Sequence, residues 1–449
     1  MTAASRRLVV PATQGARRTK RRCGRRAGEN RNFIFYHMHL RFFLLLLLGA
    51  AWAHGAEVRL SLENAGTQVR ARNPELRALR WRIEEARGRM DAAGRWTNPE
   101  VGVEYRNDTD FGEGGLAFSV DQKFPLTRRL LREKEVSAKQ VELAEWEVRD
   151  AERLMVAEAE TLTVELLTLD KQHALLRQQA EVAAQQARFI ERRVKSGEIS
   201  PLDAQQAKVD SRRLALEARK LETERLKTRG RLQALLGLGA EENLVLEGGL
   251  PKQELPASGD WARRADWQQA RAEENAARSE IALAEAKRWD DISVGVVVEG
   301  EREENDAGRK EDSVFVGFRV SLPLPLWNDN SGEVREKKAA AERVRLGAEA
   351  LMVAISHELR LAREEMRDAL ELAREVREEL LPLAQEQVAA LEKAYAAGQA
   401  ELLAVLKARE QCLQLEDGLL AAERNFSLAW VRYRAATANS TNSSAITQP

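Results

Sequence analysis

The chain contains two copies of one pattern, and this internal repeat limits its fold more than any other feature of the sequence. Three landmarks recur in the same order at offsets of 193, 200 and 201 residues: Arg95-Trp96 as Arg288-Trp289, Phe118 with Pro125 as Phe318 with Pro325, and Gly197 as Gly398. The repeat predicts two equivalent halves, 57–238 and 263–436, with a connector over 239–262 that is rich in Gly, Pro and Glu.

Long paired helices are expected in each half. Aromatic residues make up only 5% of the chain and charged residues 32%, which is typical of helices that bury a narrow seam. In the first half, apolar residues recur at spacings of three and four: Ala144, Val148, Ala151, Met155, Ala159, Leu162, Leu166 and Leu169. This spacing predicts a helix over about 130–195, on the order of 100 Å long. A turn at Gly197 and a returning helix over 202–236 follow, and Gly398 marks the corresponding turn of the second half.

Each half also contains a segment with a period of two, which predicts a β-hairpin over about 100–124 and another over about 291–322. The strands are near ten residues long and apolar on one face, as expected for strands of a transmembrane barrel. A polar external loop is expected over 300–313. Strands half-buried against a soluble helical core are the alternative interpretation. The candidate lipid-facing residues are Val101, Val103, Tyr105, Phe118, Val120, Val294, Val296, Phe318 and Val320.

Four strands cannot close a barrel, and open strand edges cannot face lipid because their backbone groups would lack hydrogen-bond partners. Further copies of the chain must therefore complete the barrel. The predicted fold is mainly α, with two α-β-β-α repeats that supply four strands per chain to a transmembrane barrel.

The N-terminus is expected to direct export. Residues 38–53 combine a basic start, a short apolar run and Ala51-x-Ala53, which predicts a signal peptide cleaved after Ala53. Residues 1–37 are interpreted as a basic upstream extension that precedes the true start. Residues 1–56 contain eleven basic residues and one acidic residue, so the remainder carries 60 basic and 70 acidic residues. This acidic remainder argues against nucleic acid as a partner.

The sequence shows no catalytic constellation, and we expect neither an enzyme nor a bound cofactor or metal. Once the leader is removed, Cys412 is the only cysteine, and His173 and His357 lie in different predicted helices without ligand-spaced neighbours. A polar tail over 437–449 completes the chain.

These features together resemble the TolC-type outer membrane factor family. The resemblance rests on Asn73-Pro74-Glu75-Leu76, which opens the first predicted helix, on both hairpins, and on the turns at Gly197 and Gly398. The segment Leu322-Pro323-Leu324-Pro325-Leu326-Trp327, with the Asn- and Gly-containing residues up to Glu333, most resembles the cobalt-zinc-cadmium resistance branch. The resemblance implies a homotrimer in the Gram-negative outer membrane, with a twelve-stranded barrel and a helical tunnel through the periplasm. It also implies a periplasmic adaptor, an inner-membrane pump of the resistance-nodulation-division type, and metal cations as cargo.

The same resemblance implies that the helix turns form the periplasmic mouth and dock the adaptor. Carried over by position, the docking residues are Val194, Gly197, Glu198, Ile199, Ser200, Tyr395, Gly398, Gln399 and Ala400. Family members often ring the mouth with acids just after the second turn, but this chain has Ala404 and Lys407 there. Asp203 and Glu401 are the candidate aperture acids instead, and solvated helix-end carboxylates are the alternative interpretation.

Two other functions remain open at the level of sequence. The channel could serve drug efflux or type I protein secretion. A soluble periplasmic coiled-coil adaptor or scaffold is the alternative from another class, although its single helical hairpin would differ from the two predicted here.

Overall fold

The computed structural model describes residues 57–437, except 110–112, 199, 240–241, 258 and 305–308. The upstream extension, the signal peptide with Ala51 and Ala53, Ile199, and the tail beyond Thr437 lie outside the described residues. The helices are α2 (Ala65–Arg72), α3 (Pro74–Ala92), α4 (Arg129–Lys195), α5 (Pro201–Leu235), α6 (Ala265–Ala286), α7 (Ser331–Glu375), α8 (Leu381–Ala396) and α9 (Leu402–Ala436), with a π-helical segment η2 (Val376–Leu380). The strands are β1 (Glu57–Leu60), β2 (Glu100–Asn107), β3 (Gly114–Phe124), β4 (Asn243–Leu246), β5 (Ile292–Glu304) and β6 (Lys310–Ser321).

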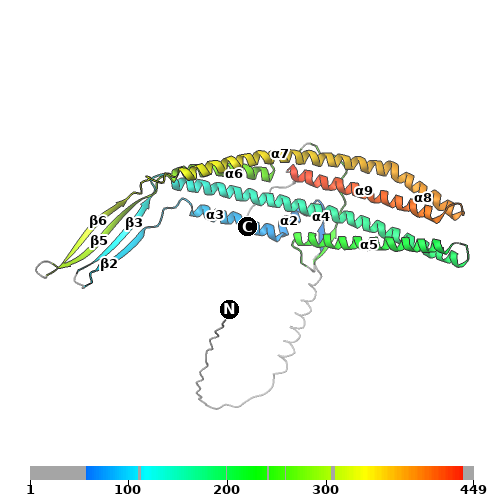
Figure 1. Ribbon diagram of the computed structural model, residues 1–449, viewed down its shortest axis with the longest axis horizontal. Helices are drawn as coiled ribbons and strands as arrows, with labels where there is room; N and C mark the ends of the chain where they lie inside the picture. The colour runs from blue at the N-terminus through cyan, green and yellow to red at the C-terminus, as the bar shows by residue number, and fades with distance from the viewer. Residues whose placement is uncertain are drawn as a thin grey trace, which may run out of the picture. The chain divides into compact units, whose positions relative to one another are not determined.

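Helix α4 organises the helical part. It runs for 67 residues, which at about 1.5 Å per residue gives a length on the order of 100 Å. It contacts α2, α3, α5, α6 and α9 along its course (Figure 1). The predicted apolar seam underestimates how much of the helix surface is buried in the middle of α4. Glu160, Thr163 and Val164 are buried there, although they lie outside the seam. Neighbours on several sides, and not one partner helix, surround α4 there.

The second half repeats this arrangement with one interruption. Helices α7 and α8 run antiparallel to α9, and the π-helical segment η2 separates α7 from α8. Pro382 lies in the first turn of α8. Because proline has no N–H and its ring clashes with the carbonyl four residues earlier, a regular α-helix cannot pass through this position undisturbed. The π segment is the local adjustment, and the repeat pattern gave no sign of it.

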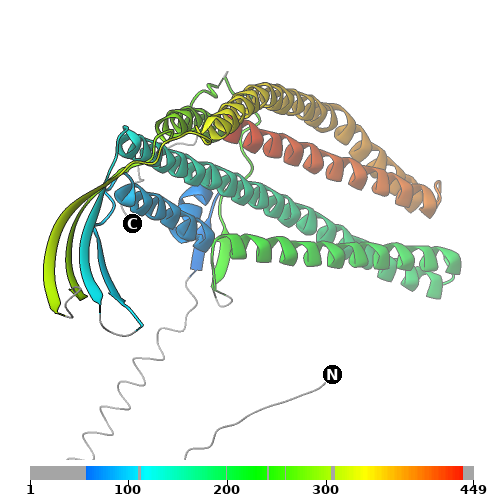
Figure 2. The ribbon, with the colours of Figure 1, turned by 60° about the vertical axis from the view of Figure 1, so that its left-hand side comes forward.

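The four-stranded sheet lies at one end of α4, α6 and α7, and the α4–α5 and α8–α9 turns lie at the other end (Figure 1). The strand order is β2-β3-β5-β6 and all neighbours are antiparallel. Figure 2 shows the strands curving together as one sheet. The two hairpins from opposite halves of the chain thus join through β3 and β5, and β2 and β6 form the edges.

The polar loop expected over 300–313 is wrong in length. Strand β5 continues to Glu304 and strand β6 begins at Lys310, so most of the charged segment is paired strand. Arg302 and Asp312 face each other in the ladder and form an ion pair of 2.8 Å between Nε and Oδ1. Cross-strand pairing of opposite charges compensates for the low strand preference of charged residues in this segment.

A second, two-stranded sheet was not predicted. Strand β4 lies in the segment interpreted as a connector and pairs in parallel with β1, from Glu57↔Asn243 to Leu60↔Leu246. Leu60 and Leu244 are buried in the main core, together with Val69 of α2 and Leu166 of α4. Helix α2 was missed as well, because the predicted first helix began at Asn73, which is the N-cap of α3.

Candidate functional site

The four-stranded sheet has one continuous apolar face. The ladder aligns Val101, Val120, Val296 and Phe318 in one row across all four strands, and Val103, Phe118, Val298 and Val316 in the next. These side chains are exposed, with Val101 73% and Phe318 81% accessible. All nine candidate lipid-facing residues therefore lie on the same face of the sheet and are exposed. Monomeric soluble proteins rarely expose a contiguous apolar patch of this kind.

The opposite face is mainly small or charged. One row across the strands consists of Gly102, Ser119, Val297 and Gly317, and the next of Glu104, Ala117, Glu299 and Phe315. Arg106 forms an ion pair with Glu299 on this face. Water can solvate such a surface, so the sheet separates an apolar side from a polar side.

The two helix turns have the same backbone geometry. Gly197 has φ +77° and Gly398 has φ +73°. Each glycine N–H donates to the carbonyl three residues earlier at 3.0 Å, from Gly197 to Val194 and from Gly398 to Tyr395. The next N–H donates to the carbonyl five residues earlier, at 3.0 Å from Glu198 and 2.8 Å from Gln399. This is the Schellman motif, in which a left-handed residue closes a helix and glycine carries no steric penalty.

The predicted docking residues divide into two groups. Gly197, Glu198, Ser200, Gly398 and Gln399 are exposed and Ala400 is half-buried, whereas Val194 and Tyr395 pack inward. Both inward residues contact a small core formed by Ala187, Ile190, Ala207 and Leu402, which joins the two hairpins near their turns. The sequence did not reveal this contact, because its residues come from both halves of the chain.

Two polar groups near the turns have distinctive surroundings. The hydroxyl oxygen of Tyr395 is buried and finds no hydrogen-bond partner among the described residues. Burial, followed by the nearby negative charge of Asp203, raises the pKa of this phenol. Glu198 is instead held locally, because hydrogen bonds from Arg193 and Ser196 lower the pKa of its carboxyl group.

The candidate aperture acids lie at helix starts. Asp203 is in the first turn of α5, and Glu401 is the residue before α9. Within the part of the chain that the structure describes, neither carboxylate takes part in an ion pair. An acidic side chain near the N-terminus of a helix interacts favourably with the helix dipole. Both residues therefore have a structural explanation, and both aperture roles stay predictions.

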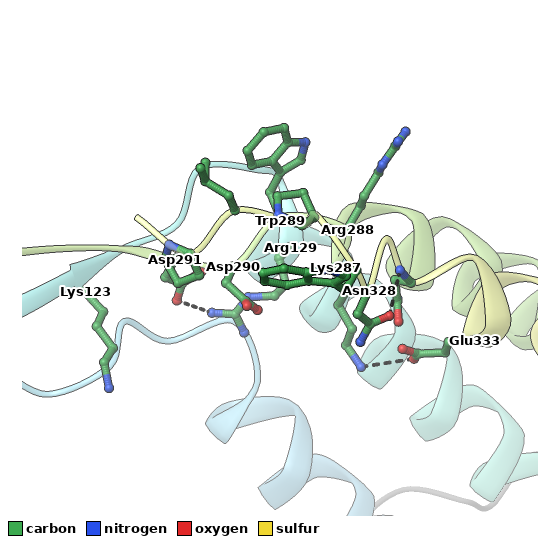
Figure 3. Close-up of a pocket in the computed structure, with 14 residues that line it drawn as sticks. Lys123, Arg129, Lys287, Arg288, Trp289, Asp290, Asp291, Asn328 and Glu333 are labelled. Carbon is green, nitrogen blue, oxygen red and sulfur yellow. Dashed lines mark hydrogen bonds and ion pairs between the residues drawn. The ribbon is translucent and has the colours of Figure 1, made fainter. Parts of the chain in front are cut away.

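A cleft of about 700 Å³ lies where the sheet meets the helices (Figure 3). Arg129 and Asp291 form an ion pair of 2.6 Å in it, and Lys287 and Glu333 form one of 3.5 Å. Asn330 adopts φ +59° before α7, and its side-chain amide donates to the carbonyl oxygen of Ala284 at 2.8 Å. The polar residues of the 322–333 segment thus build the junction between β6 and α7. The segment was noticed in the sequence, but the cleft was not.

Neither a metal site nor a membrane-spanning helix is found where the structure is described. No group of three His, Cys, Asp or Glu side chains there could hold a metal ion. None of the described helices is both long enough and apolar enough to span a membrane.

The family follows from comparison with known proteins. The model of the outer membrane efflux protein family matches residues 65–238 and 261–439, and the chain belongs to this family. A search of curated proteins finds no match to the sequence. The predicted recognition is therefore confirmed at the level of the family, whose members are outer-membrane efflux channels.

Solved structures share the fold. CusC, whose crystal structures concern folding and transmembrane channel formation, is 15% identical to this chain. The TM-score is 0.69 over 84% of this chain and 91% of that chain. The outer membrane protein VceC from Vibrio cholerae is 18% identical, with a TM-score of 0.68 over 84% and 95%. The CmeC outer membrane channel from Campylobacter jejuni is 13% identical, with a TM-score of 0.70 over 84% and 85%. The predicted fold class, mainly helical with few strands, is confirmed.

Proposed function

We propose that this protein is the outer-membrane channel subunit of a tripartite efflux system and acts as a passive duct. Three copies contribute four strands each to a twelve-stranded barrel, and their helices form a tunnel that extends into the periplasm. A periplasmic adaptor and an inner-membrane pump complete the system. The chain does no chemistry of its own in this proposal.

The observation that carries the proposal is the exposed apolar face of a sheet with two open edges. Removing apolar surface from water contributes roughly 25 cal/mol per Å², so a face of this kind favours a membrane or a partner over water. The backbone groups along the outer sides of β2 and β6 need hydrogen-bond partners in a membrane, where water is absent. Pairing of β2 of one copy with β6 of the next satisfies both requirements.

Crosslinking tests this arrangement. In a Cys412→Ser background, Val101→Cys on β2 and Val320→Cys on β6 place one thiol on each sheet edge. A short bismaleimide applied to outer membranes should then give covalent dimers and trimers. The matched control is Val120→Cys with Val296→Cys, which are cross-strand neighbours within one chain and should give only an internal link. A monodisperse monomer with all its strands intact would contradict the trimer.

Fractionation separates the duct from the alternative of a soluble periplasmic scaffold. The duct should require detergent for release from the outer membrane, because its apolar sheet face contacts lipid. Recovery of the folded chain in the periplasmic extract without detergent would favour the scaffold.

The adaptor is proposed to dock on the exposed residues of the two turns: Gly197, Glu198, Ser200, Gly398, Gln399 and Ala400. The inward packing of Val194 and Tyr395 supports a role beneath this surface, where they hold the two turns together. Ile199 belongs to the predicted docking set and lies outside the described residues.

Heavy-metal cations moved by a resistance-nodulation-division pump are the proposed cargo. The support is the resemblance of the 322–333 segment to the cobalt-zinc-cadmium branch. CusC shares the fold, but so do other outer-membrane channels, so the fold does not select the cargo. Complementation of a deletion strain is the test, with growth measured on cobalt, zinc and cadmium, on a drug panel, and for secretion of a type I substrate. Rescue of drug tolerance or secretion alone would overturn the metal assignment.

A further inference from the structure

The repeated Arg-Trp pairs have no role in the duct described so far. Arg95-Trp96 precedes β2, and Arg288-Trp289 precedes β5, at equivalent positions of the two halves. Trp96 is 60% exposed and Trp289 is 40% exposed. Trp327, which follows β6, is 95% exposed. Three indoles therefore lie at the end of the sheet that adjoins the helices, and the protein core covers none of them.

Trp96 and Trp289 lie on the same side as the apolar face of the sheet. Trp96 contacts Phe124 edge to face, with ring centroids 5.4 Å apart, and Phe124 belongs to the same strand face as Phe118 and Val120. In Figure 3, Arg288 and Trp289 project to one side of the chain, whereas Lys123 projects to the other. Lys123 belongs to the polar face and pairs with Glu100 at 2.8 Å. Arg288 and Trp289 thus lie on the side of the apolar face.

The two arginines are available to bind an anion. Neither Arg95 nor Arg288 forms an ion pair among the residues that the structure describes, and Arg288 acts only at longer range on Asp329. The neighbouring cations of the cleft, Arg129 and Lys287, are already paired with carboxylates. Asp290 also lines the cleft and would repel an anion there. Arg288, Trp289 and Trp327 line the same cleft, and Figure 3 shows the Arg288 side chain projecting away from the ion pairs of the cleft. An anionic group is therefore expected at the guanidinium of Arg288 and not between the paired residues.

We propose that Arg95-Trp96 and Arg288-Trp289, assisted by Trp327, bind the phosphate headgroups of anionic phospholipids where the sheet leaves the membrane. The proposal rests on the proposed function, because it requires the apolar face to lie in a bilayer. Tryptophan prefers the boundary between headgroups and acyl chains, where its ring is buried and its N–H is hydrated. A guanidinium binds phosphate oxygens through two parallel hydrogen bonds. Each chain offers two such sites on the helix side of the sheet, one at each repeated Arg-Trp pair.

Native mass spectrometry of the full-length, delipidated protein in detergent tests the proposal. Phosphatidylglycerol and phosphatidylethanolamine are titrated separately, and bound lipids are counted for each assembly. We expect phosphatidylglycerol to bind more tightly. Arg95→Gln and Arg288→Gln should each weaken its binding roughly fivefold, as expected for one cationic side chain near an anionic surface.

Arg319→Gln is the matched control. Arg319 is exposed on β6, on the polar face of the sheet, and forms no ion pair within the described residues. The proposal predicts that this change leaves lipid binding unaltered. An equal loss in Arg319→Gln, or unaltered binding in the Arg95→Gln, Arg288→Gln double variant, would overturn it. Full competition by millimolar inorganic phosphate would reassign the arginines to a free-anion site and overturn the lipid assignment.

Vesicle flotation separates failure of this proposal from failure of the duct. Protein that does not float with phosphatidylcholine vesicles contradicts the membrane location itself, and with it both proposals. Protein that floats as a trimer but shows no preference for phosphatidylglycerol contradicts only the headgroup sites.

Discussion

Gly197 and Gly398 show how single residues shape the end of the molecule. Both have positive φ, and an added Cβ would meet no atom within 4 Å at either position. A larger side chain would therefore disturb the backbone conformation and not the packing. For a residue other than glycine, the left-handed conformation costs roughly 1–2 kcal/mol.

Gly197→Val and Gly398→Val should alter the turns without preventing assembly. We expect normal amounts of outer-membrane trimer, with loss of adaptor crosslinking and of efflux in the same cells. Gly230→Val is a suitable control, because Gly230 lies within α5 and also has free space around it. Normal efflux in both turn variants would remove the docking assignment, and loss of the trimer would show that the glycines serve folding.

Tyr395 offers a second test at this scale. Its hydroxyl group is buried without a hydrogen-bond partner among the described residues, so Tyr395→Phe should leave stability unchanged or increase it by about 1 kcal/mol. Because the pKa of Tyr395 is raised in the folded protein, folding favours the neutral phenol. The stability that the folded protein gains from this neutral phenol is complete below the ordinary tyrosine pKa of about 10, and it is lost as pH rises further. Thermal unfolding at alkaline pH should therefore show a smaller loss of stability in Tyr395→Phe than in the wild type.

The elements differ in how well the sequence predicts them. The long helices and the hairpins follow from periodicity, because each buries or exposes one regular face over many residues. Strands β1 and β4 are four residues long and pair across the entire first half, so neither carries a periodic signal of its own. The inward packing of Val194 and Tyr395 depends on contacts between the halves. The family resemblance could name these residues by position but could not orient their side chains.

Strand β5 provides a matched test of the sheet faces. Val296 lies on the apolar face and Val297, the next residue, on the opposite face. Val296→Arg should destabilise the assembled protein by roughly 2–4 kcal/mol if the site is near the bilayer midplane, because a charge is poorly tolerated there. Val297→Arg should cost much less. Reversible urea unfolding in lipid vesicles measures both, and equal costs would contradict the lipid-facing assignment.

At the scale of the whole molecule, one of the contacts that join the two halves is a small buried ion pair. Glu160 of α4 is buried and forms an ion pair with Arg434 of α9. Val164 and Val431 pack beside it. Burial, and then the positive charge of Arg70, lowers the pKa of Arg434. Glu160 is thus shielded from water between the first and second repeat, whereas the side chain of Arg434 stays partly exposed.

Removal of one partner should weaken the whole molecule. Arg434→Ala leaves the carboxylate of Glu160 buried without its counter-charge, and a loss on the order of 3–5 kcal/mol is expected. The Glu160→Gln, Arg434→Met double variant should recover most of that stability, because no buried charge remains. Denaturant unfolding of the purified protein measures the difference. A double variant as unstable as Arg434→Ala would show that packing of the arginine, and not its charge, joins the halves.

The parallel pairing of β1 with β4 has a consequence for the order of synthesis. The ribosome makes β1 before any other described element, whereas β4 appears only after the whole first repeat. On the proposed export route, the pairing of β1 with β4 cannot form until the segment between the repeats has crossed the inner membrane. When the two strands pair, they join the start of the first repeat to the segment that follows it. A chain truncated before Asn243 could not reach that point, however well its helices formed.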